Sequence, residues 1–382
     1  MPSDHAAPRL DVDRILADPG VRIIVCCGAG GVGKTTTAAA IALRAAERHG
    51  RRTVVLTIDP ARRLAQSLGL TELDNTPRPV KGINVEASGG ELHAMMLDMK
   101  RTFDEVVLAH TDPAKAAEIF ANPFYQAVSS TFSGTQEYMG MEKLGQLYAR
   151  GEWDLIVVDT PPSRSALDFL DAPARMSRFL DGRMLRLLLA PARAGGRNMF
   201  NLVTASFGLF SRAVQKILGA QLLADISGFV AALDSMFGGF RQRAEQTYRI
   251  LQARETAFLL VATPEPDAIR EAAYFARRLG DERMPLSGLV LNRVHRTTVP
   301  ELTAEQSLRA AAELSRIGGH EGTVDVLRVH AALAERTARE QRTTAIFTDA
   351  FPSVPMVAVT AQPVDVHDVD GLRAIGAAVS GT

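Results

Sequence analysis

Residues 28–35 combine the types and the spacing that bind phosphate. Their sequence, GAGGVGKT, fits the pattern G-x-x-x-x-G-K-[ST] between a short apolar run and an alanine-rich stretch. Glycines in such a loop let backbone amides approach phosphate oxygens, and the helix that follows directs its positive end at them. Lys34 is expected to bridge the β- and γ-phosphates, and the Thr35 hydroxyl to ligate Mg²⁺. The spacing therefore predicts a nucleoside triphosphate site rather than a chance glycine-rich turn.

Two aspartates follow apolar runs and complete the predicted chemistry. Asp159 ends DLIVVD, where its carboxylate is expected to hold the metal ion through water. Asp59 ends RTVVLTID, which we expect to be the strand next to the phosphate-loop strand. It would then face the γ-phosphate and the metal, and orient or deprotonate the attacking water. An equally good alternative is that Asp59 caps a helix starting at Pro60.

The pattern around Asp159 favours ATP over GTP. A GTPase has glycine three residues after this aspartate and an N-K-x-D motif that binds the base, whereas here Pro162 holds that position and no N-K-x-D occurs. We therefore expect ATP and Mg²⁺ as ligands, and no zinc, haem or flavin. Cys26 and Cys27 are the only cysteines and lie together on one apolar run, which is typical of core residues.

The chain as a whole is balanced in charge. Its 382 residues contain 43 Lys plus Arg and 43 Asp plus Glu, with no polybasic run, which argues against nucleic acid or an anionic membrane as the main partner. The start of the chain lacks the apolar core of a secretion signal. No run of about eighteen uncharged apolar residues occurs, so we expect a soluble, cytoplasmic protein without a membrane span.

Short apolar, β-branched runs alternate with helical patterns along the chain. The predicted strands are 21–27, 52–59, 154–159, 257–263, 285–292 and 354–359, with a possible extra strand at 92–98. Predicted helices include 35–48, 266–279 and 326–341, whereas 295–323 has the composition of an irregular surface connection. The alternation predicts an α/β fold: a doubly wound, mostly parallel sheet of the phosphate-loop type.

Two long helical stretches interrupt this alternation and exceed usual connection lengths. They predict a large inserted helical subdomain. The expected nucleotide-binding core is 1–98, 151–170 and 255–382, and the expected helical subdomain is 99–150 and 171–254. Within it, 199–240 contains only four charged residues and many Phe, Leu and Met. This segment is either a groove for apolar helices or the ordinary core of the subdomain.

These motifs, in this order, resemble the arsenical pump-driving ATPase family, which includes the ATPases that deliver tail-anchored membrane proteins. The matching segments are GGVGKTT (30–36), TIDPARRL (57–64), FSGTQE (132–137), DTPPSRSALDFL (159–170), TPEPDAIREA (263–272), LNRV (291–294) and QPVDVHDVDGL (362–372). They span roughly residues 20–380.

The resemblance implies a set of site residues and a dimer. By it, Asp59 activates water, Asn292 with Arg293 contacts adenine, and Pro363 with Val364 forms a wall of the base pocket. The phosphate contacts would come from Gly28, Ala29, Gly30, Gly31, Val32, Gly33, Lys34, Thr35 and Thr36. Two nucleotides would face each other across the dimer, which closes with ATP and opens after hydrolysis or release.

Three positions depart from the family pattern. Ala29 stands where the family usually has a lysine that reaches across the dimer to the partner's phosphates. Loss of that charge can cost several orders of magnitude in rate, by analogy with arginine fingers. Three explanations fit: the chain alone hydrolyses slowly, Arg164 substitutes for the lysine, or a lysine-bearing relative supplies the charge in a heterodimer. Arg164 is explained at least as well as a solvated residue at a helix start. The usual T-G-H is replaced at 163–165 by Ser-Arg-Ser. C-x-x-C is missing, which excludes a zinc clasp, and the predicted helical region has no cysteine, which excludes a three-cysteine arsenite site.

Four functions fit these observations. The first is an ATP-hydrolysing dimeric switch whose nucleotide state controls an apolar, membrane-protein client. The second is a low-activity regulatory subunit of a heteromeric ATPase, and the third is the motor subunit of an anion-transport system. The fourth, a phosphotransferase acting on a small metabolite, shares the phosphate loop but lacks a recognisable acceptor-binding signature.

Overall fold

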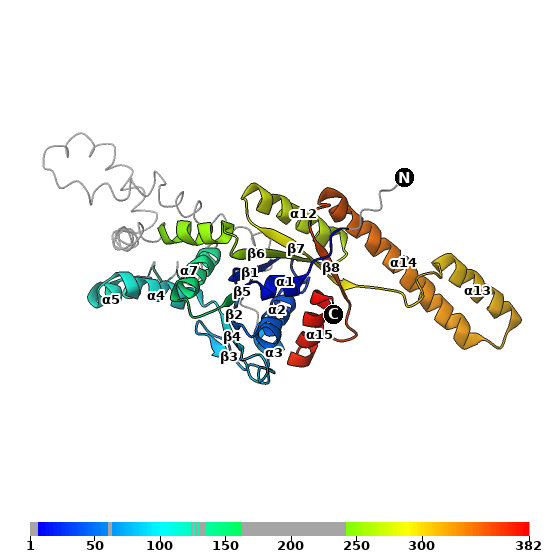
Figure 1. Ribbon diagram of the computed structural model, residues 1–382, viewed down its shortest axis with the longest axis horizontal. Helices are drawn as coiled ribbons and strands as arrows, with labels where there is room; N and C mark the ends of the chain where they lie inside the picture. Colours follow the sequence, from blue (N-terminus) through cyan, green and yellow to red (C-terminus); the bar gives the residue numbers. More distant parts are fainter. Residues whose placement is uncertain are drawn as a thin grey trace, which may run out of the picture. The chain divides into compact units, whose positions relative to one another are not determined.

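The computed structural model describes residues 7–59, 63–123, 125, 126, 129, 135–161 and 242–381 (Figure 1). The chain divides into two compact units. The first comprises Met1–Met96, Arg150–Leu167 and Ile250–Thr382, and the second comprises Leu97–Ala149 and Asp168–Arg249. All residues expected to contact the nucleotide belong to the first unit.

The first unit is built on an eight-stranded sheet in the order β3-β4-β2-β5-β1-β6-β7-β8. The strands are β1 Ile23–Cys27, β2 Arg52–Thr57, β3 Arg78–Pro79, β4 Glu91–Met96, β5 Leu155–Asp159, β6 Thr256–Ala262, β7 Leu286–Val294 and β8 Met356–Thr360. Only β3 and β4 pair antiparallel, and every other neighbouring pair is parallel. The predicted doubly wound, mostly parallel α/β fold is confirmed.

Helices cover both faces of this sheet, which is why its central strands are continuous apolar runs. Every residue of β1, β5 and β6 is buried. Figure 1 shows α2 (Lys34–His49) and α15 (Val369–Ser380) on one face and α12 (Pro266–Asp281) on the other. This unit also contains two short helices before β3 in the sequence, α1 (Val12–Ala17) and α3 (Arg63–Ser67).

The strand order corrects one expectation about Asp59. The strand that ends at Asp59 was expected beside β1, and this is wrong because β5 lies between β1 and β2. Asp159, at the end of β5, is therefore the aspartate directly next to the phosphate-loop strand. Asp59 follows β2 at the same edge, since β2 and β5 are parallel and the Ile58 amide donates to the Asp159 carbonyl at 2.9 Å.

The expected irregular connection at 295–323 is wrong in part, because α13 occupies Ala304–Ile317. A capping box starts this helix: Thr303 accepts from the Gln306 amide, and the Gln306 side chain accepts from the Thr303 amide. The T-x-x-Q spacing is visible in the sequence, and apolar periodicity alone does not reveal it. The helix that follows, α14, covers Glu321–Ala350 and is longer at both ends than predicted.

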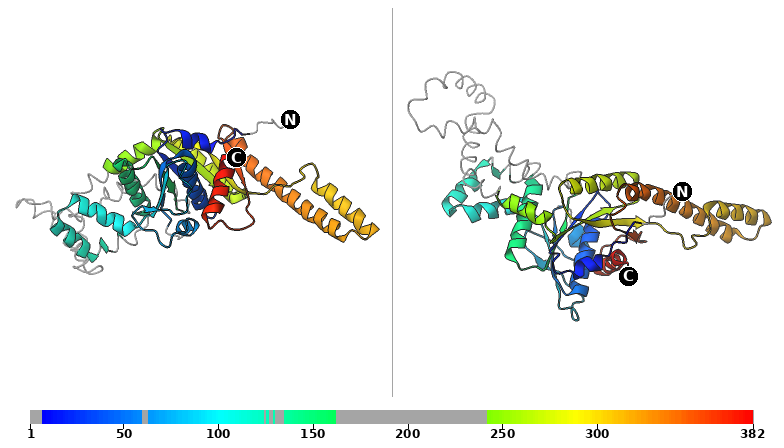
Figure 2. Two further views of the ribbon diagram at one scale, coloured as in Figure 1. Left: turned by 60° about the horizontal axis from the view of Figure 1, so that its bottom comes forward. Right: turned by 45° about the horizontal axis from the view of Figure 1, so that its top comes forward.

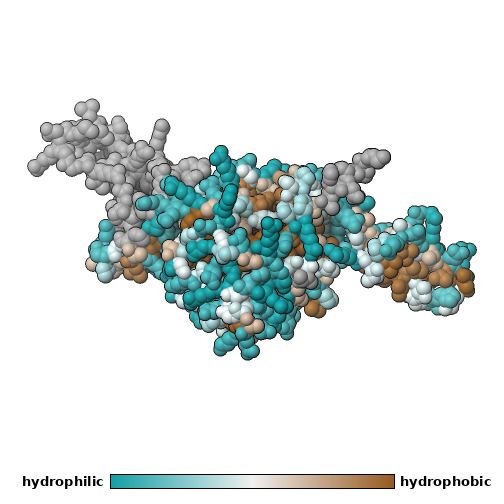
Figure 3. Space-filling view, in the orientation of Figure 1, coloured by the Kyte–Doolittle hydropathy of each residue, from teal (hydrophilic) through white to brown (hydrophobic). Residues whose placement is uncertain are grey.

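Helices α13 and α14 form an antiparallel hairpin within the first unit. Small buried residues, Ser307 and Ala311 on α13 and Ala331 on α14, allow close packing. The Ser307 hydroxyl also hydrogen-bonds the His330 ring at 2.9 Å. The second half of α14 lies against α12, as Figure 2 shows. Figure 3 shows apolar side chains on the hairpin surface, where Leu308, Ile317, Val326, Val329 and Ile346 are exposed.

The described part of the second unit is helical. It contains α4 (Met99–His110), α5 (Pro113–Ala121), most of α7 (Thr135–Arg150) and the helical residues 242–249. Its core includes two buried charges with partners: Lys143 pairs with Glu105, and Glu142 pairs with Arg243, each at 3.0 Å. The predicted apolar segment 199–240 lies outside the described residues, as does Arg164.

No described helix is both long and apolar enough to cross a lipid bilayer.

Arg51 joins the start of β2 to three other segments of the first unit. Its side chain is only 7% exposed. Its guanidinium donates to the Val21 carbonyl at 2.7 Å, to the Leu16 and Asp18 carbonyls at 3.4 and 3.3 Å, and to the Asp154 carbonyl. One planar donor group therefore satisfies carbonyls from three segments: the end of α1, the loop before β1 and the turn before β5.

Replacing Arg51 with methionine leaves these carbonyls without a donor. We expect Arg51→Met to lower the free energy of unfolding by about 2–4 kcal/mol, measured by urea denaturation followed by circular dichroism. Arg52→Met is the matched control, because Arg52 is half exposed and its ion pair with Glu91 is worth less than about 1 kcal/mol. Equal losses in the two variants would show that Arg51 has no special structural role.

Candidate active site

The phosphate loop leaves β1 at the carboxyl edge of the sheet and packs tightly against its surroundings. Gly28 has a φ of 153°, and a Cβ there would lie 2.0 Å from the Val261 carbonyl oxygen. Gly33 has a φ of 95°, and a Cβ there would lie 2.3 Å from the Asn292 amide nitrogen. Both positions require glycine, because the backbone is left-handed or closely packed there.

The amino end of α2 is open to an anion. Gly33 is its N-cap residue, and no side chain caps the first turn. The first amides of the helix therefore lack intrahelical acceptors and carry the positive end of the helix dipole. Lys34 is the first helical residue, only 5% exposed, and its ammonium donates to the Ala29 carbonyl at 2.8 Å. A phosphate oxygen can replace that carbonyl as the acceptor.

Asp159 is a fully buried carboxylate held by two hydroxyl groups. One carboxylate oxygen, Oδ2, accepts from the Thr35 hydroxyl at 2.8 Å and from the Thr57 hydroxyl at 2.9 Å. The other, Oδ1, is buried and has no hydrogen-bond partner among the described residues. Burial raises the pKa of Asp159 to about 6, although the two hydroxyls and Lys34 act to lower it. A buried carboxylate oxygen without a partner is costly unless water or a cation meets it.

The residues around Asp159 fit a magnesium ion. Among the described residues, no group of three or more His, Cys, Asp or Glu side chains is placed to hold a metal. Mg²⁺ commonly keeps several waters and takes the rest of its ligands from substrate phosphates and one or two protein groups. The Thr35 hydroxyl and the free oxygen of Asp159 supply this kind of partial ligand set.

Asp59 lies near these groups. It is half-buried, directly beyond β2, and its amide donates to the Thr57 hydroxyl at 3.2 Å. Burial lowers the pKa of Lys34 and raises that of Asp159, and the charge of Asp59 acts to raise both. The three groups therefore share one electrostatic environment. Residues 60–62 lie outside the described part, so the helix-capping alternative for Asp59 stays open. The structure thus gathers Lys34, Thr35, Asp59 and Asp159 at one edge.

Asn292 contacts the phosphate loop itself. Its amide nitrogen donates to the Val32 carbonyl at 2.9 Å, and its oxygen accepts from the Arg293 amide at 3.0 Å. Arg293 has a φ of 58°, a left-handed backbone that is uncommon outside glycine. Asn292 therefore braces the loop, a role that the sequence analysis missed because residues 32 and 292 meet only in the folded chain. The amide keeps a second N–H and a second oxygen lone pair, so an adenine contact does not require either bond to be exchanged.

The remaining predicted residues surround this arrangement. Pro363 and Val364 lie in the exposed loop between β8 and α15, and Val364 is 70% exposed. This loop follows the carboxyl end of β8, and the parallel pairing of β7 and β8 puts it on the same edge as Asn292. Cys26 and Cys27 are buried in β1, where burial raises both thiol pKa values, that of Cys27 to about 12. Neither thiol takes part in the site chemistry.

The pKa of Asp159 predicts a pH dependence for magnesium-assisted ATP binding. Protonation below about pH 6 removes the charge that attracts the cation, so the affinity for ATP with magnesium should fall as the pH drops through this value. Calorimetric titrations from about pH 5 to about pH 7.5 measure the effect. Asp159→Asn is the control: it should bind weakly and retain only the pH dependence of ATP itself. Identical pH profiles for the two proteins would contradict this assignment.

The contacts of Asn292 predict how its loss affects different ligands. Asn292→Ala should weaken inorganic tripolyphosphate and ATP by similar factors, about tenfold each, because the loop loses a brace that both ligands need. Competition against a fluorescent nucleotide gives both affinities. A loss confined to ATP would instead identify Asn292 as a residue that contacts the base.

Comparisons with a family model and with individual proteins point to the same family. The model of the anion-transporting ATPase family matches residues 21–317. Similar proteins include ATPase ASNA1 homolog 2 of Paramecium tetraurelia, 25% identical over 284 residues that cover 73% of this chain and 78% of the relative. ATPase GET3 of Malassezia globosa is 28% identical over 177 residues, 46% of this chain and 50% of the relative.

A third relative is a putative arsenical pump-driving ATPase 1 of Aquifex aeolicus, 27% identical over 183 residues, 45% of this chain and 44% of the relative. The chain thus spans about half the length of the last two relatives. The family model, in contrast, covers most of the chain, including the phosphate loop, both aspartates and Asn292. The resemblance stated from the motifs is confirmed, and the chain belongs to the anion-transporting ATPase family.

Proposed function

We propose that this ATPase binds ATP with magnesium at the edge formed by the phosphate loop, Asp59 and Asp159. The observation that supports it most directly is the free Oδ1 of Asp159, which is buried beside the Thr35 hydroxyl and the ammonium of Lys34. A buried carboxylate, a hydroxyl and a lysine at an uncapped helix start form a site that is complete only with a cation and a phosphate chain.

Each side chain has a distinct role in this proposal. Lys34 and the first amides of α2 bind the phosphate oxygens, and Lys34 exchanges its bond to the Ala29 carbonyl for one to phosphate. Thr35 and Asp159 hold the magnesium ion, which neutralises phosphate charge when bound. Asp59 orients or deprotonates the attacking water. Arg293, Pro363 and Val364 are proposed to surround the base.

The rate of the isolated chain depends on Ala29. This residue offers only backbone groups to the site, so no cation from this position can stabilise the phosphates. We therefore propose slow hydrolysis by the chain alone, with a dimer as the working form, either of two copies or with a lysine-bearing relative. In the second case the chain acts as a low-activity regulatory subunit, and mixing the two proteins should raise ATP turnover sharply.

The names of the relatives suggest what the nucleotide cycle controls. The resemblance to the family that includes the ATPases delivering tail-anchored membrane proteins supports a cytoplasmic switch that holds or releases an apolar membrane-protein segment, with 199–240 as the proposed client region; ATPase ASNA1 homolog 2 and ATPase GET3 are among the similar proteins. The name of the Aquifex relative and the family description favour a second candidate, the motor subunit of an anion-transport system. Stimulation of turnover by an oxyanion would favour this candidate, whereas nucleotide-dependent protection of 199–240 in hydrogen exchange would favour the switch.

The hydrolysis proposal is tested by separating binding from turnover. Asp59→Asn should lower kcat at least 100-fold, an order of magnitude taken from general base catalysis, and leave ATP affinity within a few-fold. Lys34→Ala should lose ATP binding. Asp281→Asn, an exposed acid at the end of α12, is the control and should behave as the parent. Phosphate release and equilibrium binding are measured on the same samples. An Asp59→Asn protein as fast as the parent would remove Asp59 from the mechanism.

A further inference from the structure

A cleft separate from the phosphate loop lies where the second half of α14 passes the loop that follows β6. Its volume is about 570 Å³, and its lining includes 264–266 on one side and Arg336, Arg339 and Arg342 on the other. A second hollow of about 430 Å³ lies between α14 and the connection after β7, and it shares Arg339 and Arg342. Volumes of this size accommodate small ligands.

Two of the three arginines have no acidic partner within ion-pair distance among the described residues, although Glu265 and Glu340 line the cleft and Glu335 lines the second hollow. Arg336 pairs with Glu340 at 3.0 Å, and Glu340 also accepts from the amide and the ring of His295, each at 2.8 Å. The charge of Glu340 is therefore already engaged. Arg339 and Arg342, in contrast, form no ion pair with any residue that the structure describes.

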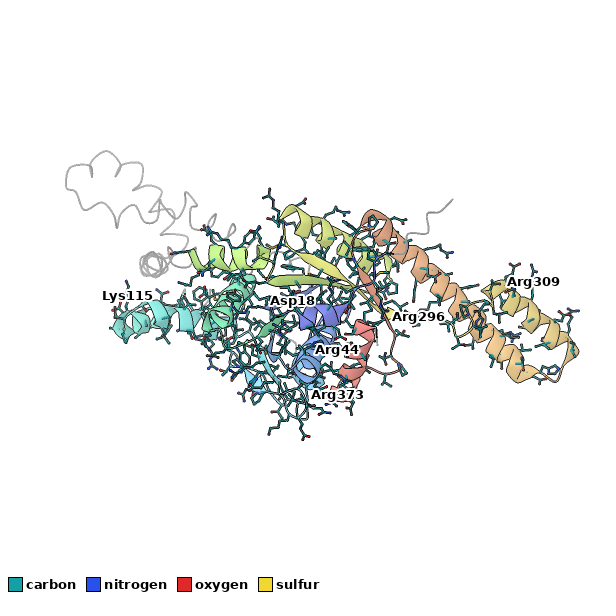
Figure 4. The ribbon with its side chains drawn as sticks, viewed as in Figure 1. Asp18, Arg44, Lys115, Arg296, Arg309 and Arg373 are labelled. Atoms are coloured by element: carbon teal, nitrogen blue, oxygen red, sulfur yellow. The ribbon has the colours of Figure 1, made fainter. Side chains whose placement is uncertain are left out.

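Two arginines on other parts of the hairpin do form ion pairs. Arg309 pairs with Glu305, and Arg328 pairs with Asp325 at 3.7 Å. Figure 4 labels Arg309 on α13. Arg316, near the end of α13, has no ion pair among the described residues and lines neither hollow. Arg339 and Arg342 differ from it in lining both hollows.

The opposite wall of the cleft adds a second feature that favours an anion. It consists of the start of α12, a 16-residue helix that begins at Pro266 and whose N-cap residue, Glu265, makes no capping bond with its side chain. The first amides of α12 therefore contribute positive potential to the cleft. Glu265 itself lines the cleft and is the acid that an incoming anion must avoid or displace.

We propose that this cleft binds a phosphate group of a second ligand, with Arg339 and Arg342 as the donors. Residues three apart on a helix lie side by side, so two guanidinium groups can share one phosphate. Arginine binds phosphate through two parallel N–H donors, which makes it more specific for such groups than lysine. The ligand is either a soluble diphosphate or the headgroup of a phospholipid, since both present the same oxygens.

Inorganic pyrophosphate is the first probe, used with the full chain carrying Lys34→Ala to weaken the phosphate loop. We expect calorimetry to show binding that falls at least tenfold, about 1.4 kcal/mol, when Arg339→Ala and Arg342→Ala are added. Arg309→Ala is the matched control and should leave the affinity unchanged. Any residual binding at the phosphate loop is common to all three proteins, so the difference reports the cleft alone. Equal affinities, or no binding in any protein, would overturn the proposal.

Vesicles distinguish the two sources of phosphate. The parent chain is sedimented with vesicles of phosphatidylglycerol and, separately, of phosphatidylcholine alone. Binding to the first that is lost in the Arg339→Ala and Arg342→Ala protein assigns a lipid headgroup, whereas pyrophosphate binding without vesicle binding assigns a soluble ligand. A failed pyrophosphate test overturns the proposal but leaves the ATP site untouched, because neither arginine belongs to it.

Discussion

The whole site depends on the bond between the Thr35 hydroxyl and the buried carboxylate of Asp159. This bond joins the first turn of α2 to the end of β5. It holds the Thr35 hydroxyl 2.8 Å from Oδ2 of Asp159, the proposed magnesium ligand. Thr57 holds the same oxygen from β2, which leaves the second oxygen free. Because burial disfavours the charged form, the carboxylate gains most from a nearby cation. A magnesium ion bound with ATP would therefore stabilise the charged form of this buried carboxylate.

Parallel strand order explains why distant residues meet at this edge. The carboxyl ends of neighbouring parallel strands lie together, and ligands of open α/β sheets bind where the connections diverge. A series of hydrogen bonds continues from the phosphate loop along this edge. Val32 is bonded to Asn292 at the end of β7, and His295, just beyond that strand, is bonded to Glu340 in α14. Two pairs of hydrogen-bonded residues, linked through the end of β7, therefore connect the phosphate loop with the hairpin.

Local sequence patterns predicted the strands and most helices well, but not which strands and side chains lie next to each other in the fold. The phosphate loop was recognisable because glycine and lysine positions within eight residues encode it, and buried parallel strands appear as continuous apolar runs. The position of β5 between β1 and β2 was not recognisable, because strand order depends on long crossovers rather than on the strands. The same holds for the brace from Asn292, which spans 260 residues. Helix α13 was missed for a different reason, since its capping box is stronger than its apolar pattern.

The most direct test is a calorimetric titration of the intact chain with ATP in magnesium and again in EDTA. If the free oxygen of Asp159 and the turn around Lys34 form one magnesium–triphosphate site, the chain should bind one nucleotide in magnesium, and chelation should weaken binding at least tenfold, about 1.4 kcal/mol. No heat in magnesium, or equal affinity with and without the metal, would contradict the account.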